Sequence, residues 1–149
     1  MLFRSVAFTH LNSIGSAEDI DPVLTWERGA SFVRGTRVAH DLSPSRGMLQ
    51  RGIDYRMDVK KVMTFTPPCH VVIDITRTEA HPAPGQAPRI AAHHMIINSM
   101  TPETESSCHY FWANARDHDL DNAQMTALAL RQTGDAFAED KLKIGRAHV

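Results

Sequence analysis

A chain of 149 residues is long enough to bury the core of one ordinary domain, and 42% hydrophobic residues suit a globular protein. Its 16 basic and 17 acidic residues give a formal net charge of −1, which offers no basis for binding nucleic acid or an anionic membrane. No apolar run approaches the roughly 20 residues of a transmembrane helix, and the N-terminus lacks a secretory pattern, which favours a cytoplasmic location. Cys69 and Cys108 lie far apart without a CxxC motif, so we expect two reduced, buried thiols.

The two ends of the chain resemble translated sequencing adapter rather than protein. Residues 1–5 (MLFRS) and 144–149 (IGRAHV) correspond to one adapter sequence read in its two opposite orientations. Such segments are excluded from reasoning about the fold. We therefore expect residues 1–5 and 144–149 to be adapter-derived, and residues 6–143 to be an interior slice of a longer gene.

The slice begins with residues 6–21, whose mixed composition predicts a loop or a frayed helix end. Strand character then recurs, with β-branched and aromatic residues in partial alternation. Six segments show it: Val23–Glu27, Ser31–Asp41, Asp54–Thr66, Cys69–Thr78, Ile90–Met100 and Ser106–Arg116. Residues 28–30 predict a hairpin between the first two, and Pro and Gly predict loops at 43–52 and 81–88.

The signal changes to helix from Asp121 to Lys143, a segment rich in Ala, Leu, Gln and Glu. Asp119 or Asp121 is the expected N-cap, because a carboxylate accepts hydrogen bonds from the unpaired amides of the first turn. An apolar stripe at helical spacing comprises Met125, Leu128, Ala129, Ala136 and Phe137. The predicted fold class is therefore α+β: an antiparallel sheet of five or six strands, with the long helix packed on one face.

Four motifs carry a resemblance to a known family. They are Thr66–Ile73 (TPPCHVVI), Met100–Glu105 (MTPETE), His109–Ala113 (HYFWA) and Phe137–Lys141 (FAEDK). In order and spacing they resemble the C-terminal catalytic domain of Rieske-type non-haem iron oxygenases, the group of the vanillate O-demethylase, dicamba and toluenesulfonate monooxygenases. The resemblance covers nearly all of residues 6–143 and implies a helix-grip (START/Bet v1-like) fold, here incomplete.

The resemblance implies the terminal oxygenase (alpha) subunit of an aromatic monooxygenase system, an oxidoreductase of aromatic catabolism that performs O-demethylation or methyl hydroxylation. Such an enzyme uses O2, a mononuclear Fe(II), and electrons from NADH that pass through a partner reductase and a [2Fe-2S] Rieske cluster. The parent protein is expected to be a homotrimer that acts on an aromatic small molecule. Cys69-His70 and Cys108-His109 lack the spacing of Rieske ligands, so the cluster is expected in an N-terminal domain outside this chain, and the chain alone to be inactive. The alternative is a non-catalytic small-molecule-binding module of the same fold.

The resemblance also implies site residues. The iron of this family is held by two histidines and one carboxylate, which leaves coordination positions open for O2. The second histidine matches His10 and the carboxylate matches Asp140, while the first histidine would fall at Ser5, so the metal site is expected to be incomplete. His70 and Asn98 match positions that line the substrate pocket. Plainer interpretations stay open, namely an exposed loop residue for His10, a solvated acid for Asp140 and a strand-end histidine satisfied by backbone for His70.

Periodicity by itself does not identify the carboxylate. Asp140 follows Phe137 by three residues, but Glu139 lies near the other edge of the apolar stripe. His93 and His94 are adjacent in a predicted strand, so they point to opposite faces and cannot chelate one ion side by side. We expect one of them in the core and one on the surface.

Overall fold

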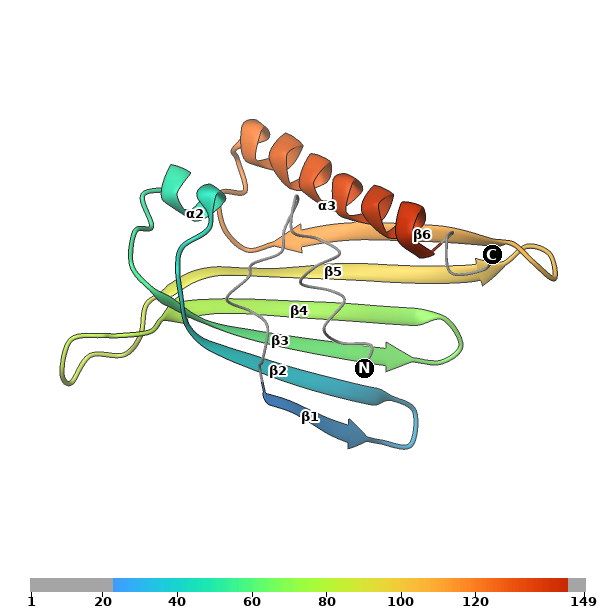
Figure 1. Cartoon of the computed structure of the whole chain (residues 1–149), viewed down its shortest axis with the longest axis horizontal. Helices are drawn as coiled ribbons and strands as arrows, with labels where there is room; N and C mark the ends of the chain where they lie inside the picture. Colours follow the sequence, from blue (N-terminus) through green and yellow to red (C-terminus); the bar gives the residue numbers. More distant parts are fainter. Residues whose placement is uncertain (1–22, 145–149) are drawn as a thin grey trace. The chain divides into compact units, whose positions relative to one another are not determined.

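A computed structural model of the protein describes residues 23–144. Six strands form one antiparallel sheet in chain order, so each strand pairs with its neighbours in sequence (Figure 1). The strands are β1 (Val23–Arg28), β2 (Val33–Leu42), β3 (Met57–Thr66), β4 (His70–Glu79), β5 (Ile90–Pro102) and β6 (Cys108–Arg116). The six predicted strands are confirmed, with ends displaced by a few residues, and the predicted loop at 81–88 joins β4 to β5.

The hairpin predicted between the first two strands is confirmed. The backbone amide of Gly29 donates to the Phe32 carbonyl over 3.0 Å and closes the turn between β1 and β2. Trp26 pairs with Gly35 in the register of these strands, and its ring lies over the glycine. A Cβ at Gly35 would lie 2.9 Å from Cζ3 of Trp26, so a larger residue there would displace the indole from its present position.

Two local predictions are wrong. The segment 43–52, predicted as a loop, contains the five-residue helix α2 (Arg46–Gln50), which ends before Gly52 at a φ of 75°. Helix α3 (Ala123–Ile144) is capped by Asn122 rather than by an aspartate, because Oδ1 of Asn122 accepts from the amides of Gln124 and Met125 at 3.1 Å. A side-chain oxygen at the N-cap satisfies amides that have no partner inside the helix.

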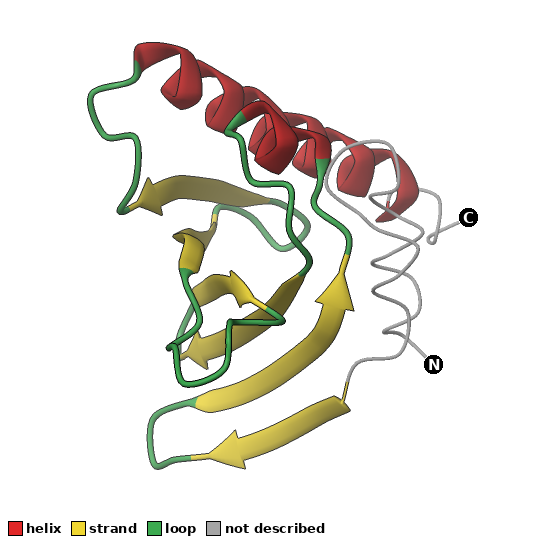
Figure 2. Cartoon of the chain, turned by 90° about the vertical axis from the view of Figure 1, so that its left-hand side faces the viewer, coloured by secondary structure: helices red, strands yellow, loops and turns green. Residues whose placement is uncertain are grey.

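The sheet has two chemically different faces, and Figure 2 shows that it is strongly curved. Cross-strand partners share a face and successive residues alternate between faces. The face that carries Asn98 also carries five of the six buried apolar residues of the described strands, namely Ala39, Met57, Val59, Ile75 and Ala92, while the sixth, Ala91, lies at the irregularity in the pairing of β4 with β5. We call it the Asn98 face. The opposite face carries His93, His70 and the 61% exposed Phe111.

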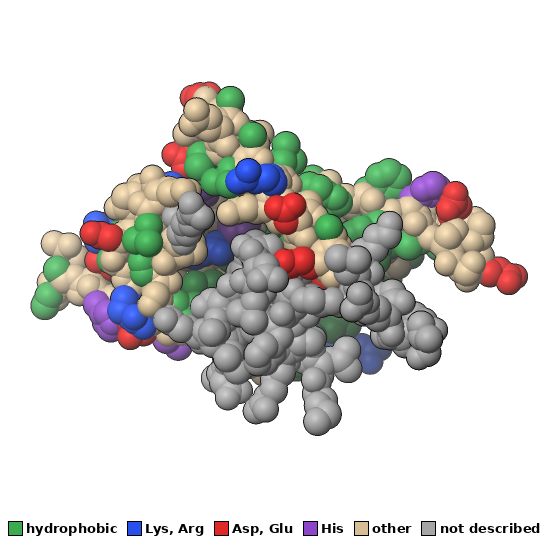
Figure 3. All heavy atoms as spheres, turned by 45° about the horizontal axis from the view of Figure 1, so that its top comes forward, with side chains coloured by type: hydrophobic (Ala, Val, Ile, Leu, Met, Phe, Trp, Pro, Cys, Tyr) green, Lys and Arg blue, Asp and Glu red, His purple; other side chains and the backbone are tan. Residues whose placement is uncertain are grey.

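The strands and α2 belong to one compact unit, and α3 belongs to a second. Along α3 the predicted apolar stripe is confirmed, since its five residues are buried or half-buried. Leu130, seven residues before Phe137 at the edge of the stripe, is 51% exposed. On the face drawn in Figure 3, hydrophobic side chains are scattered among charged ones. Among the described helices, none is long and apolar enough to cross a membrane.

Candidate functional site

Asp140 lies on the buried side of α3. Among residues 123–140 of the helix, Thr133 and Ala136 are the most buried, at 6% and 4% exposure. Asp140 follows them by seven and four residues, so the three side chains form one line along the helix. Glu139 is about a quarter-turn from this line, although it is also half-buried. The burial pattern therefore favours Asp140 where periodicity alone left both acids open.

The other predicted metal ligand, His10, lies outside the described residues. Within residues 23–144, no three side chains of His, Cys, Asp or Glu are grouped so that they could hold a metal ion. Asp140 is half-buried near the C-terminus of α3, where the helix dipole disfavours negative charge, and it has a contact in the described part of the chain. Its assignment as a metal ligand stays a prediction.

Asn98 is buried at 5% exposure and its amide is held from both ends. Its Nδ2 donates to the carbonyl of Val71 over 3.2 Å, and its Oδ1 accepts from the hydroxyl of Tyr110 over 2.6 Å. Because a carbonyl can only accept, the end of the amide that faces Val71 must be the nitrogen, and the Tyr110 hydroxyl then donates to the oxygen end. The pair places the half-exposed phenol of Tyr110 at the Asn98 face.

The two predicted pocket residues are not brought together. Val71 pairs with Asn98 and His70 with Ser99, so the side chains of His70 and Asn98 point to opposite faces of the sheet. Nδ1 of His70 lies 2.6 Å from the Ser99 hydroxyl, and His70 is exposed. One ligand on the Asn98 face would therefore meet Asn98 and Tyr110 rather than His70.

His93 and His94 point to opposite faces, as predicted from their adjacency in a strand. On the face opposite Asn98, the His93 ring lies between two carboxylates, with Nε2 3.1 Å from Asp74 and Nδ1 3.2 Å from Asp117. His94 lies on the Asn98 face, where Nη1 of Arg77 is 3.2 Å from its Nδ1. Burial, and then the positive charge of Arg77, lower the pKa of His94 to about 4. At neutral pH this ring is uncharged.

The Asn98 face carries a polar row across the middle of the sheet. In register, Arg37 pairs with Lys61, Lys61 with Ile75, Ile75 with His94, and His94 with Arg116. The next row along the strands is apolar where it crosses β3, β4 and β5, at Met63, Ile73 and Ile96. Asn98 and its partner Tyr110 follow beyond it. Met63, Ile73 and Ile96 therefore form an apolar floor. This floor lies between the polar row and the hydrogen-bonded pair of Asn98 and Tyr110.

Sequence reasoning missed Arg77, His94 and Tyr110 as members of one surface. The alternation of side chains along each strand could have shown which residues of that strand share a face, because residues two apart point to the same side. Which residues of different strands lie side by side depends on register, and register is set by hairpin lengths and bulges that the pattern does not reveal. The bulge between Ala39 and Leu42 in β2 is one such feature.

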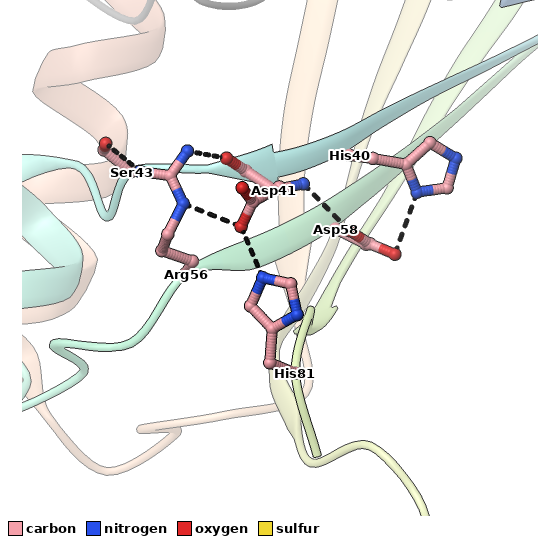
Figure 4. A network of polar contacts seen from close by, with 6 residues as sticks. All are labelled: His40, Asp41, Ser43, Arg56, Asp58 and His81. Carbon is pink, nitrogen blue, oxygen red and sulfur yellow. Dashed lines mark hydrogen bonds and ion pairs between the residues drawn. The ribbon is translucent and has the colours of Figure 1, made fainter.

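A second polar network lies at the exposed end of β2 and β3 (Figure 4). Asp41, with a φ of 56°, accepts from Nε of Arg56 at 2.7 Å and from Nε2 of His81 at 2.8 Å. Arg56 also donates to the carbonyl of Asp41 and to Ser43. The hydrogen bonds from Arg56 and then His81 hold the pKa of Asp41 below its usual value. These contacts fasten the start of the β4–β5 loop to the β2 bulge.

Asp58 extends the same network. Burial by itself would raise its pKa, but hydrogen bonds from the Asp41 amide at 3.0 Å and from Nδ1 of His40 at 2.9 Å outweigh burial and lower it. Two separate carboxylates each pair with a different histidine, and the arrangement acts as a structural clamp.

The cysteines are free thiols, as predicted, but Cys108 is exposed and Cys69 is half-buried. The expectation that both are buried is therefore wrong. Cys69 lies in the turn that precedes β4, and Cys108 is the first residue of β6. A shallow hollow on the solvent side of α3, lined by Leu120, Ala123, Ala127 and Leu130, holds none of the predicted site residues.

A six-stranded antiparallel sheet followed by a long helix is the architecture of helix-grip catalytic domains of Rieske oxygenases. The crystal structure of dicamba monooxygenase bound to 3,6-dichlorosalicylic acid superimposes with a TM-score of 0.70 at 16% identity, covering 99% of this chain and 47% of that one. The dicamba-bound structure of the same enzyme gives a TM-score of 0.67. The predicted fold class is therefore confirmed.

The chain belongs to the vanillate O-demethylase oxygenase C-terminal domain family, whose model matches residues 5–148. The vanillate O-demethylase oxygenase subunit of Pseudomonas sp. (strain ATCC 19151) is 33% identical, over 89% of this chain and 43% of that subunit. The toluene-4-sulfonate monooxygenase system iron-sulfur subunit TsaM1 of Comamonas testosteroni is 25% identical, over 95% of this chain and 43% of that subunit. The chain thus spans less than half the length of these relatives and corresponds to their C-terminal part.

Proposed function

We propose that this chain is the catalytic-domain portion of the terminal oxygenase of a cytoplasmic, Rieske-type aromatic monooxygenase, which removes a methyl group from an aryl ether or hydroxylates an aryl methyl group. In the first reaction an aryl methyl ether, O2, NADH and a proton give a phenol, formaldehyde, NAD+ and water. The electrons would come from a partner reductase through a [2Fe-2S] cluster in a preceding domain. Family membership supports the reaction class.

We assign Asp140 and His10 as two ligands of a mononuclear ferrous ion, which supplies O2 activation when bound. The observation that carries the assignment is the position of Asp140 on the line of Thr133 and Ala136, the most buried of residues 123–140 of α3. Asp140 is half-buried and already has a contact in the described part of the chain. A nearby cation favours the charged form of a partly desolvated carboxylate, and a ferrous ion would supply that charge.

The contribution of the sheet is to bind and orient the aromatic substrate. The floor formed by Met63, Ile73 and Ile96 suits a flat ring, and the Asn98–Tyr110 pair offers a positioned polar contact beside it. Apolar lining with a few convergent polar groups is typical of small-molecule sites. Excluding water around the ring and holding one orientation would select which methyl group reacts.

A chimera tests this function. Residues 6–143 of the chain would replace the corresponding C-terminal part of the Pseudomonas vanillate O-demethylase oxygenase subunit, which supplies the upstream histidine and the cluster domain. With the reductase of that system and NADH, we expect formaldehyde from vanillate or 3-methoxybenzoate, or a hydroxylated product from toluene-4-sulfonate. A folded chimera with an intact cluster that binds no iron and forms no product would instead support the non-catalytic binding module.

A further inference from the structure

We infer that Cys69, His70 and Ser99 form a reactive-thiol site on the face of the sheet opposite Asn98, at which Sγ of Cys69 adds to a quinone. This site is separate from the Asn98 face and does not depend on the proposed function. His70 belongs to one of the sequence motifs, yet its side chain points away from Asn98. Cys69 is the nucleophile, His70 the base and Ser99 the residue that positions the base.

The three side chains follow one another in contact. Sγ of Cys69 lies 3.8 Å from Nε2 of His70, and Nδ1 of the same ring lies 2.6 Å from the Ser99 hydroxyl. A nucleophile, a base within reach and a third group that orients the base are the signature of an activated nucleophile, and such contacts are often long before a ligand binds. One nitrogen of the imidazole therefore faces the thiol and the other faces the hydroxyl.

The Ser99 hydroxyl suits the base in both of its protonation states. It can accept from Nδ1–H of His70, which leaves the lone pair of Nε2 to take the thiol proton. In the protonated ring, Nδ1–H still donates to the hydroxyl and Nε2–H faces the sulfur. Because the thiolate is the nucleophilic form of cysteine, proton transfer to His70 activates Sγ of Cys69.

Strand pairing holds the site in place. Ser99 is the register partner of His70, and the amide of Met100 donates to the carbonyl of Cys69 over 3.1 Å. Groups that are held by paired strands need little rearrangement before they act. Cys69 is half-buried and His70 is exposed, so a small electrophile can reach the sulfur.

A second Cys-His dipeptide in the chain is arranged differently. Cys108 and His109 begin β6, and Cys108 is exposed. Nε2 of His109 lies 3.6 Å from a carboxylate oxygen of Glu103, and its ring centroid lies 6.1 Å from that of Phe111. The thiol–imidazole contact at Cys69 is therefore a result of the fold and not of adjacency in the sequence.

The neighbouring side chains indicate the class of electrophile. Ser99 pairs with Phe111, and Ile97 lies two residues from Ser99 on the same face. Phe111 is 61% exposed and Ile97 is 40% exposed. Exposed aromatic and aliphatic side chains beside a nucleophile favour a flat, apolar reactant that can stack on them. A quinone has such a ring, together with electron-poor C=C bonds that thiolates attack.

The addition conserves all atoms and needs no further oxidant or reductant. The electron pair of the sulfur forms an S–C bond to a ring carbon, and the C=C π pair moves to the conjugated carbonyl oxygen. The thiol proton passes through Nε2 of His70 to that oxygen. The hydrogen on the attacked carbon then moves to the other ring oxygen, which gives a hydroquinone bonded to Sγ of Cys69.

Adduct formation on the full chain tests the site. Limiting 1,4-benzoquinone is added at pH 7, and peptide mass spectrometry gives the rates at Cys69 and Cys108. In urea the two thiols, each followed by a histidine, should react at similar rates. In the folded chain we expect Cys69 to react at least about fivefold faster than the more exposed Cys108, because it has a base in contact. A folded-state ratio no higher than the ratio in urea would overturn the site.

Variants identify the base and the residue that positions it. His70→Gln should slow addition at Cys69 by about tenfold and leave the rate at Cys108 unchanged, which also reports that the fold is intact. Ser99→Ala should slow Cys69 several-fold, and Ser99→Thr, which keeps the hydroxyl, should restore the rate. His109→Gln is the matched control and should not affect Cys69. An unchanged rate at Cys69 in both His70→Gln and Ser99→Ala would overturn the assigned roles.

A second reagent tests the aromatic class. Phe111→Ala should slow the addition of benzoquinone to Cys69 several-fold, because the ring loses its stacking partner. Alkylation of Cys69 by iodoacetamide, which has no ring, should proceed at the wild-type rate. Equal effects of Phe111→Ala on the two reagents would overturn the preference for a quinone.

Discussion

The hydroxyl of Tyr110 on β6 donates to Oδ1 of Asn98 on β5 over 2.6 Å, while Nδ2 of the same amide donates to the Val71 carbonyl on β4. This chain of contacts ties three strands together on one face. Asn98 is 5% exposed, so the loss of either partner leaves a buried polar atom without a hydrogen bond. Such a loss costs more than the bond itself contributes.

Tyr110→Phe is therefore expected to lower the free energy of unfolding by about 1–3 kcal/mol, because the aromatic ring is kept and the Asn98 oxygen loses its donor. Urea unfolding followed by tryptophan fluorescence measures the change. Phe111→Leu, at a 61% exposed position on the opposite face, is the control and should change stability by roughly 0.5 kcal/mol or less. Equal effects of the two substitutions would contradict the buried contact.

His94 predicts a specific pH dependence of stability. Its pKa falls from 6.5 to about 4 on folding, so between these values the unfolded chain binds a proton that the folded chain does not. Stability should therefore decrease as pH falls from about 6.5 to about 4, by up to roughly 3 kcal/mol, and change no further on account of this group below that window. His94→Gln should flatten the curve there. A His94→Gln curve that parallels the wild type would show that the ring titrates normally.

The N-cap of α3 gives a third test. Asn122 accepts from two backbone amides of the first turn at 3.1 Å, and Asn122→Ala removes the acceptor. We expect a loss of about 1 kcal/mol in the free energy of unfolding, with reduced helical signal in circular dichroism. Asp121→Ala, one residue earlier, is the matched control and should have a smaller effect. A larger loss of stability in Asp121→Ala than in Asn122→Ala would instead support the aspartate N-cap that the sequence predicted.

The clamp around Asp41 should control the mobility of the β4–β5 loop. His81→Ala removes one of two hydrogen-bond donors to the Asp41 carboxylate, and Arg56 remains. Amide hydrogen exchange at Ala80, whose amide donates to the Arg56 carbonyl at 2.9 Å, should accelerate by about two- to fivefold. As pH falls through the lowered pKa of Asp41, the carboxyl becomes protonated and wild-type exchange should approach that of the variant. If amide exchange at Ala80 were unchanged in His81→Ala, the contact between His81 and Asp41 would not restrict the mobility of the loop.

Most of the architecture was predictable because it depends on local chemistry. β-branched and aromatic residues at alternating positions marked the six strands, and Pro and Gly marked the loop at 81–88. Helix α2 was missed because its five residues are too few to show helical periodicity. The N-cap was misplaced because Asp119, Asp121 and Asn122 are all good caps, and backbone geometry decides among them: Asp119 has a φ of 51° before the helix begins.

The site was predictable only in part. Asp140 came from a motif and is supported by its buried line on α3, while nothing described bears on His10. Asn98 came from the same resemblance, but its fixed amide and its partner Tyr110 depend on the pairing of β5 with β6. The separation of His70 from Asn98 follows from a one-residue difference in register, which places neighbours on opposite faces.

The choice between Asp140 and Glu139 is the remaining test of the metal site, and it uses the chimera. Asp140→Asn keeps size and shape but removes the negative charge, so we expect iron content to fall at least about tenfold, with the Rieske cluster intact. Glu139→Gln is the matched control one residue away and should retain iron, because it lies off the line of Thr133 and Ala136. Iron per subunit by mass spectrometry, read beside the visible spectrum of the cluster, measures both. Loss of iron in Glu139→Gln with retention in Asp140→Asn would identify Glu139 as the ligand instead. Adjacent residues of a helix point in different directions, so we expect only one of these two carboxylates to face the metal.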